Sequence, residues 1–143
     1  MFAKMKERFA GSVNKFSGKK DFLEAVCAAA ALIAIADGEI EDEEVAKVIA
    51  SITANPKLSG AFSSREIEAT AETMFNRAKA GRAARVGLYT EISEISRDPE
   101  MAEAVVGIAF DVAESDGQIE PGEKVVIDKI AGSLKIDLKK FDV

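Results

Sequence analysis

An acidic stretch that occurs twice constrains the fold of this chain more than any other feature. Residues 37–44 and residues 116–123 both read Asp-Gly-x-Ile-Glu-x-x-Glu, and the copies are offset by 79 positions (116 against 37). Each copy follows an apolar run and precedes another with helical spacing. Glycine ends helices readily because it adopts left-handed backbone angles, and carboxylates are favoured in the first turn of a helix. The repeat therefore predicts two helix–turn–helix units, one in each half of the chain.

The rest of the sequence is also helical in pattern, because apolar side chains recur three and four residues apart and no stretch alternates with a period of two. We expect an all-α fold, a pseudo-symmetric bundle of about seven helices that includes a helix at 1–18, with residues 19–143 as its single domain. Two middle helices join the two repeats. The expected elements are helices at about 20–36, 41–54, 63–80, 86–95, 99–115 and 120–132, the last ending at Gly132, a polar loop from Asn55 to Ser63, and a terminal turn at 137–143 anchored by Leu138 and Phe141.

The residue types that are missing exclude most catalytic chemistry. The 143-residue chain has no histidine and a single cysteine, Cys27. Without histidine there is no HExxH zinc site, no Ser-His-Asp or Cys-His nucleophile and no Glu-x-x-His di-iron site. A hydrolase with metals on carboxylates alone would lack a recognisable nucleophile, base or oxyanion donor. We therefore expect no catalytic residues and no enzymatic activity, and the lone thiol favours a reducing cytosol.

Carboxylates are the groups that remain for binding, and the repeat gathers them. Each copy matches the second half of an EF-hand calcium loop, with Asp, Gly, Ile and Glu at its fifth, sixth, eighth and twelfth positions, but lacks the first and third ligands. Three or four oxygens per copy fall short of the 6–8 that Ca²⁺ takes, so unless the copies combine we expect weak binding of Ca²⁺, Mn²⁺ or Mg²⁺, on the order of 10⁻⁴ to 10⁻³ M. The candidate metal ligands are Asp37, Glu41, Glu44, Asp116, Glu120 and Glu123.

The same carboxylates have a structural alternative. Asp-Gly is a common turn, and Glu44 and Glu123, at the third helical position, can accept hydrogen bonds from their own cap backbones. Acidic residues in a first helical turn also gain about 0.3–1 kcal/mol each from the helix dipole. The five carboxylates between residues 39 and 44 exceed what capping needs, and this excess favours a cation.

The start of the chain differs from the remainder in charge. Residues 1–20 carry a net charge of +5, and the remainder, at −11, gives the chain its net charge of −6. The strong negative charge of residues 21–143 would repel phosphates and so argues against nucleic-acid binding. Residues 1–18 read as a basic amphipathic helix, which either covers the domain or docks onto a membrane surface or an acidic partner. The docking candidates are Phe2, Lys4, Lys6, Arg8, Phe9 and Phe16.

Taken together, these features resemble the tellurite resistance protein TerB family. The resemblance rests on the duplicated helix–Asp-Gly-x-Ile-x-x-x-Glu element, the basic aromatic N-terminus and the terminal stretch 133–137 with Phe141. It implies a small bacterial protein with an all-helical bundle fold, cytoplasmic or peripheral at the inner membrane. It further implies a role in resistance to tellurite and other stresses, association with the membrane protein TerC, and divalent-cation binding through Asp37, Glu44, Asp116 and Glu123.

Three positions depart from the pattern of that family. Glu41 and Glu120 stand where a serine cap is common, and Gly122 is unusual in a first helical turn because glycine has a low helix propensity. The second copy is therefore expected to hold a cation less firmly. Tellurite is itself an anion that acidic turns repel, so direct sequestration of tellurite is not expected.

Overall fold

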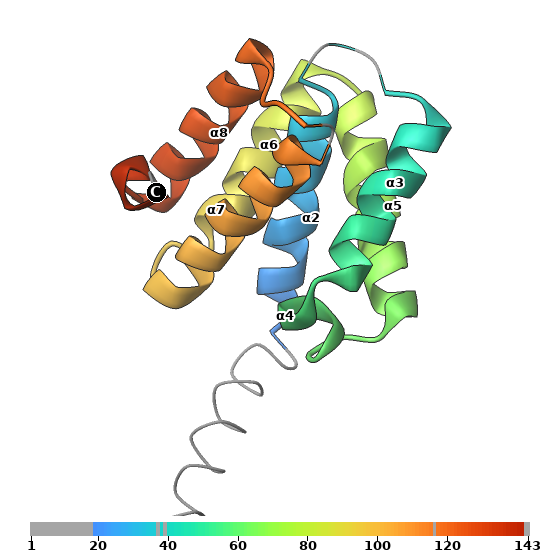
Figure 1. Cartoon of the computed structure of the whole chain (residues 1–143), viewed down its shortest axis with the longest axis horizontal. Helices are drawn as coiled ribbons and strands as arrows, with labels where there is room; N and C mark the ends of the chain where they lie inside the picture. Colours follow the sequence, from blue (N-terminus) through green and yellow to red (C-terminus); the bar gives the residue numbers. More distant parts are fainter. Residues whose placement is uncertain (1–18, 37, 39, 116, 142–143) are drawn as a thin grey trace, which may run out of the picture.

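The computed structural model describes residues 19–36, 38, 40–115 and 117–141, which form a bundle of helices (Figure 1). No strand occurs among these residues, so the expected all-α fold is confirmed. The elements are α2 (Lys20–Ala34), α3 (Asp42–Ala54), α4 (Pro56–Ser59), α5 (Ser64–Lys79), α6 (Arg82–Ser93), α7 (Pro99–Glu114), α8 (Pro121–Leu134) and the 3₁₀ helix η1 (Leu138–Phe141).

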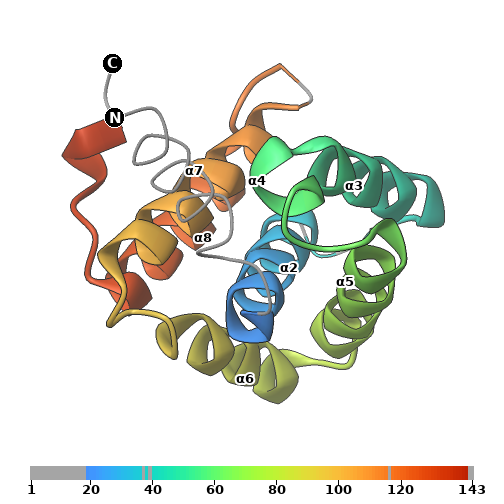
Figure 2. The same ribbon diagram turned by 90° about the horizontal axis from the view of Figure 1, so that it is seen from below.

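Helix α2 lies at the centre of the bundle because its side chains are small and apolar. Every residue from Ala25 to Ile33 is buried, and five of the seven residues from Ala25 to Ala31 are alanine. A helix that is apolar on all sides belongs in a core, and small side chains let its neighbours approach closely. Accordingly, α2 contacts α3, α5, α6, α7 and α8, which surround it in Figure 2.

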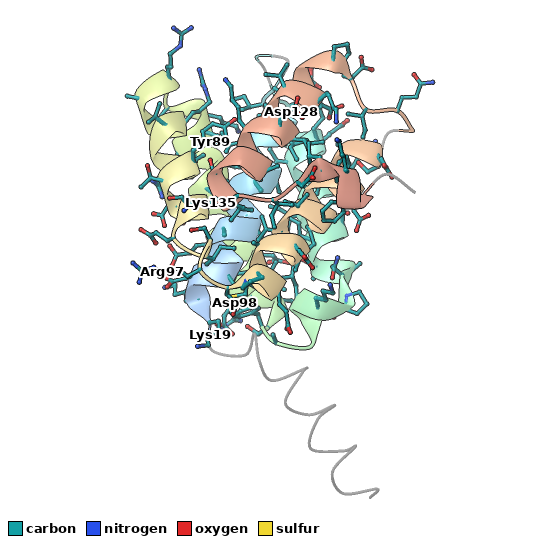
Figure 3. The ribbon with its side chains drawn as sticks, turned by 90° about the vertical axis from the view of Figure 1, so that its left-hand side faces the viewer. Lys19, Tyr89, Arg97, Asp98, Asp128 and Lys135 are labelled. Atoms are coloured by element: carbon teal, nitrogen blue, oxygen red, sulfur yellow. The ribbon has the colours of Figure 1, made fainter. Side chains whose placement is uncertain are left out.

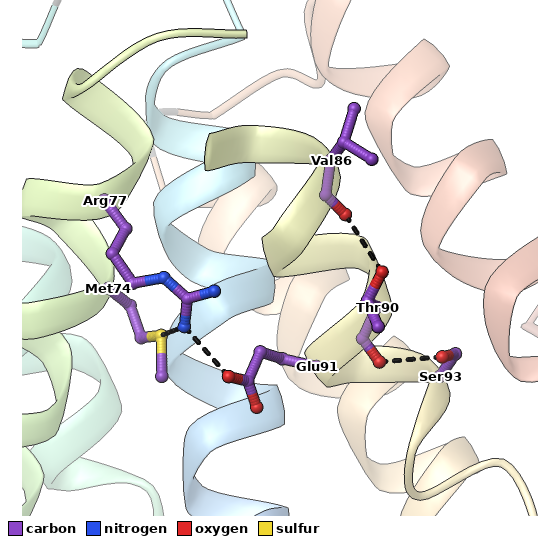
Figure 4. Close-up of polar contacts among 6 residues, drawn as sticks. All are labelled: Met74, Arg77, Val86, Thr90, Glu91 and Ser93. Atoms are coloured by element: carbon purple, nitrogen blue, oxygen red, sulfur yellow. Dashed lines mark hydrogen bonds and ion pairs between the residues drawn. The ribbon is translucent and has the colours of Figure 1, made fainter. Parts of the chain in front are cut away.

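The two predicted repeats are α2–α3 and α7–α8, and α5 and α6 are the middle helices that join them. Figure 1 shows the α2–α3 and α7–α8 turns at the same end of the bundle. The two middle helices are tied by an ion pair in which Arg77 Nη1 donates to Glu91 Oε1 at 2.9 Å (Figure 4). The topology therefore brings the two acidic copies, far apart in sequence, to one end of the molecule.

Two helix starts that the sequence marks clearly are confirmed in atomic detail. Ser63 Oγ accepts a hydrogen bond from Glu66 N at 3.1 Å, and Glu66 Oε1 accepts one from Ser63 N at 3.2 Å, which completes a capping box. At the start of α7, Asp98 Oδ1 accepts from Glu100 N at 3.1 Å while Pro99 occupies the first helical position. Both starts are set by local chemistry alone.

The expectation of a polar loop between Asn55 and Ser63 is wrong in part, because this stretch contains the one-turn helix α4. Asn55 Oδ1 caps this turn by accepting from Lys57 N at 3.0 Å, and Pro56 supplies the first helical residue. The turn places Leu58 fully in the core. The free energy gained by burying the Leu58 side chain stabilises a helical turn in this otherwise polar stretch.

The expected end of the last helix at Gly132 is also wrong. Helix α8 continues to Leu134, and Lys135 takes the left-handed conformation with φ 58° (labelled in Figure 3). Ile136 N donates to Ala131 O at 2.9 Å and Lys135 N donates to Gly132 O at 3.3 Å, the bonds of a Schellman motif. The motif turns Ile136 onto the core, and this contact fixes the end of the helix two residues beyond the glycine.

Because Lys135 carries a Cβ at a left-handed position, Lys135→Gly is expected to raise the free energy of unfolding by about 0.5–1 kcal/mol. Relief of a strain of about 1–2 kcal/mol outweighs the greater chain entropy of unfolded glycine. Urea denaturation measures the effect. Lys129→Gly, the same change at an exposed position inside α8, should instead lower stability by about 1 kcal/mol. A loss of stability in both variants would contradict the strain argument.

The expected terminal turn is present as η1. Phe141 stacks on Phe110 of α7 with ring centroids 5.7 Å apart, and Leu138 and Phe141 both pack against the core. The side chain of Lys124, in α8, lies 5.9 Å from the centre of the Phe110 ring. The end of the described chain is thereby fastened to the second repeat.

Candidate functional site

The two acidic turns have nearly the same backbone geometry. Gly38 and Gly117 have φ of 101° and 103°, values that side chains with a Cβ rarely adopt. Gly38 N donates to Ile35 O at 2.9 Å, and Gly117 N donates to Glu114 O at 2.8 Å. The sequence repeat is therefore also a repeat of local structure, with glycine required at the same position in each turn.

The helices that follow the two turns also begin in the same way. Glu41 and Glu120 are the N-caps of α3 and α8, with extended ψ angles of 157° and 153°. Glu44 and Glu123 therefore both occupy the third helical position. The spacing that the two copies share places a cap carboxylate and a first-turn carboxylate at the start of each helix.

Both turns open onto one pocket of about 770 Å³. Its walls come from the C-terminal ends of α2 and α7 and the N-terminal halves of α3 and α8. Three of the predicted ligands line it, namely Glu44, Glu120 and Glu123. The other lining residues are Ile33, Ala34, Lys47, Val48, Val112, Ser115, Gln118, Pro121 and Gly122.

The remaining predicted ligands are placed differently. Glu41 is exposed at the cap of α3 and does not line the pocket. Asp37 and Asp116 lie outside the described residues, so their participation stays a prediction. Sequence reasoning missed Lys47, Ser115 and Gln118, since nothing in the linear pattern says which side chains from different helices meet.

The structural alternative is realised by Glu123. Its Oε1 accepts a hydrogen bond from Glu120 N at 2.8 Å, so this carboxylate closes the cap of its own helix. Glu44 makes no corresponding bond to Glu41 N within the described residues, although it occupies the same helical position. The two copies thus share their backbone but differ in how they use the first-turn carboxylate.

Whether these residues suit a metal depends on how many oxygens they bring together. In the described part of the chain, no group of three or more acidic, histidine or cysteine side chains is close enough to hold an ion. Glu44, Glu120 and Glu123 are the type of ligand that hard cations take, but Lys47 shares their pocket. A cation site in this pocket therefore requires oxygens beyond these three carboxylates, from Asp37, Glu39 or Asp116, from neutral groups such as Gln118 and backbone carbonyls, or from water.

The structure explains why a glycine, Gly122, stands in the first turn of α8. A Cβ on this residue would lie 3.3 Å from the backbone oxygen of Ala36, the residue just before the first Asp-Gly pair. A contact that short forces the neighbour to move, and here the neighbour is backbone rather than a flexible side chain. Glycine in the first turn of α8 therefore allows the second acidic turn to pack directly on the first.

Gly122→Ala is accordingly expected to shift the amide signals of both turns in a ¹H-¹⁵N spectrum and to give no gain in stability. Gly132→Ala, in the same helix with open space around its Cβ, should raise the free energy of unfolding by about 0.5–1 kcal/mol through helix propensity. The pair separates helix propensity from the contact with Ala36. An equal gain in both variants, with the first turn unshifted, would show that the contact is of no consequence.

The single cysteine is not a reactive group. Cys27 is fully buried in α2, and this burial, reinforced by the nearby charge of Glu24, raises the pKa of its thiol from 9.0 to about 12. The thiolate is the nucleophilic form of cysteine, so Cys27 is held in its inert form at neutral pH. It packs as a small apolar side chain.

The predicted docking residues, Phe2 to Phe16, lie outside the described residues, so docking stays a prediction. Within the described ranges, no helix has both the length and the apolarity needed to cross a bilayer.

Comparison with known proteins assigns the chain to a family. The family model described as "Tellurite resistance protein TerB" matches residues 23–143, which include every described helix except the first three residues of α2. A search of curated proteins and a search of solved structures each found no match. With both acidic turns and the pocket between them inside the matched region, this chain belongs to the tellurite resistance protein TerB family.

Proposed function

We propose that this protein is a non-enzymatic divalent-cation-binding module of a bacterial stress response. The observation that carries the proposal is the convergence of two acidic turns on one pocket lined by Glu44, Glu120 and Glu123. Each turn alone offers too few oxygens for a cation such as Ca²⁺. Two turns facing one pocket bring in ligand oxygens from both copies, and Asp37 and Asp116 would supply those that the three described glutamates do not place close enough to hold an ion by themselves.

The electrostatics of the pocket indicate modest affinity. The carboxylates lie at the starts of α3 and α8, where the helix dipoles favour negative charge and so compete with a bound cation. Lys47 adds one positive charge to the same walls. The expected dissociation constant for Ca²⁺, Mn²⁺ or Mg²⁺ is on the order of 10⁻⁴ to 10⁻³ M, within the range of weak extracellular-type calcium modules.

The test is a ¹H-¹⁵N titration of the full chain with Ca²⁺ and then Mn²⁺, following the amides of Gly38 and Gly117. Saturable shifts at both glycines, and Mn²⁺ broadening around Glu44 and Glu123, are the expected result. Glu44→Gln combined with Glu120→Gln should weaken binding by about tenfold, equivalent to about 1.4 kcal/mol. Both substitutions remove a charge but keep a side-chain oxygen, so the capping box of α8, in which Glu120 accepts from the backbone N of Glu123, can persist.

The matched control is Glu68→Gln combined with Glu72→Gln. This pair removes the same charge from exposed positions on α5 that do not line the pocket. Equal weakening in both double variants would show that cation binding depends on the net negative charge of the protein and not on the pocket. Unshifted glycine amides up to millimolar metal would refute the proposal.

The second candidate is a metal-independent interaction scaffold, and the capping bond of Glu123 favours it. In that role the acidic turns only start helices, and the protein works through its basic N-terminal segment on a membrane or an acidic partner, which for this family would include a TerC-like membrane protein. Two results together would support this function: no amide shifts during the metal titration, and vesicle binding that is lost when the N-terminal basic residues are neutralised.

A further inference from the structure

We propose that the basic N-terminal segment, residues 1–18, docks into the acidic pocket of its own chain. This assigns the pocket an occupant from within the molecule. It goes beyond the cation proposal and does not depend on it, because docking needs only the negative charge and the apolar floor of the pocket.

The pocket has the two properties that such a segment requires. Ile33, Val48 and Val112 provide apolar lining, while Glu44, Glu120 and Glu123 provide negative charge against the single positive charge of Lys47. Its volume of about 770 Å³ lies within the range of binding pockets and admits several side chains.

Helix α3 also leaves apolar surface beside this pocket. Ile52 is its only fully buried residue, whereas Val45, Val48 and Ile49 are half-buried and in contact with the core. An apolar stripe that is only partly covered gains free energy when a further apolar side chain packs on it. The stripe therefore extends the pocket floor along one wall.

The segment complements this surface in sequence. Phe2, Phe9 and Phe16 recur every seven residues, so they share one face if the segment is helical. Its four basic residues against one acidic residue give residues 1–18 a charge of +3, while the stretches 37–44 and 116–123 contain six and three acidic residues. The segment therefore offers aromatic side chains flanked by basic ones, and the pocket offers apolar side chains flanked by acidic ones.

The chain length permits docking within one molecule. Helix α2 begins at Lys20 at the far end of the bundle and reaches the pocket at Ile33, so its 15 residues span about 22 Å at about 1.5 Å per residue. Eighteen residues span about 27 Å as a helix and about 60 Å extended. Tethering also keeps the local concentration of the segment in the millimolar range, so weak complementarity is sufficient.

The test uses the full chain with a nitroxide attached through Ala3→Cys. Because Cys27 is fully buried, the label reacts only at the introduced thiol. The expected result is strong broadening of the amide signals of Val48, Gln118 and Gly122 around the pocket. Signals of Leu58 and Arg97, at the end of the bundle where α2 begins, should keep their intensity.

Glu44→Gln combined with Glu120→Gln should remove most of this broadening, whereas Glu68→Gln combined with Glu72→Gln should leave it unchanged. Amide spectra of the unlabelled variants verify that each is folded. Diffuse broadening over the whole surface, or equal broadening in the two double variants, would overturn the proposal.

Two further outcomes identify a different occupant and also overturn it. Broadening in a mixture of spin-labelled ¹⁴N chain with unlabelled ¹⁵N chain would mean that the pocket takes the segment of a second copy. Absence of pocket broadening, with segment signals lost only on addition of anionic phosphatidylserine vesicles, would mean that the segment binds a membrane instead. Because no divalent metal is added, failure here leaves the cation titration untouched.

Discussion

Replacing Phe22 with alanine is expected to lower the free energy of unfolding by about 3–5 kcal/mol, the range for loss of a phenylalanine from a packed core. Phe22 is fully buried in the first turn of α2. Since α2 contacts five other helices, a cavity beside it weakens packing across the bundle rather than at one edge. Urea denaturation, followed by the helical signal in circular dichroism, measures the loss.

Phe110→Ala is the matched control for this change. Phe110 is half-buried in α7 and stacks mainly on Phe141, so removing its ring should cost only about 1–2 kcal/mol. The comparison separates the position of an aromatic ring from its size. A Phe22→Ala loss no larger than that of Phe110→Ala would show that α2 is not the helix on which the packing depends.

The second large effect is a loss of stability at alkaline pH caused by Cys27. Burial raises the pKa of the folded thiol from 9.0 to about 12, while the unfolded chain exposes an ordinary thiol. Above pH 9 the unfolded state therefore releases a proton that the folded state keeps. The thiol leaves stability unaffected below pH 9 and lowers it by about 1.4 kcal/mol per pH unit up to pH 12, a total on the order of 4 kcal/mol.

Cys27→Ala tests this assignment. The variant loses some packing at neutral pH but should show a shallower fall in stability between pH 9 and pH 12, measured by urea denaturation at a series of pH values. Partial burial also raises the pKa of the Tyr89 hydroxyl above its ordinary value, so Tyr89→Phe is measured beside it as a second alkaline group. An alkaline slope unchanged in Cys27→Ala would mean that the thiol is not the group responsible.

The sequence predicts this fold well wherever a local rule decides the structure. The Ser63–Glu66 capping box and the Asp98-Pro99 start are such cases, because a few adjacent residues determine them. Local rules fail where a distant contact decides. Gly132 has the propensity to end α8, yet the helix runs on until Ile136 can reach the core, and burial of Leu58 converts an expected loop into α4.

The candidate site divides in the same way. The repeat predicts that Glu44 and Glu123 occupy equivalent positions after equivalent turns, and the structure confirms both. It does not predict that the turns share a pocket, because that depends on how α2 packs against α7 and α8. Gly122 was the one residue in the sequence that pointed to the contact between the two turns, because a glycine in the first turn of a helix is consistent with a close approach of another backbone.

The unequal burial of α3 and α8 gives the two walls of the pocket different tendencies to detach. Helix α3 fully buries one residue, whereas α8 fully buries Ile127, Ile130, Ala131 and Leu134. Segments with few buried side chains open locally at a lower free energy than the molecule as a whole. Opening of α3 would carry Glu44 away while leaving Glu120 in place, so any occupant that touches both walls must also hold α3 closed. Occupancy of the pocket and persistence of α3 are thereby linked.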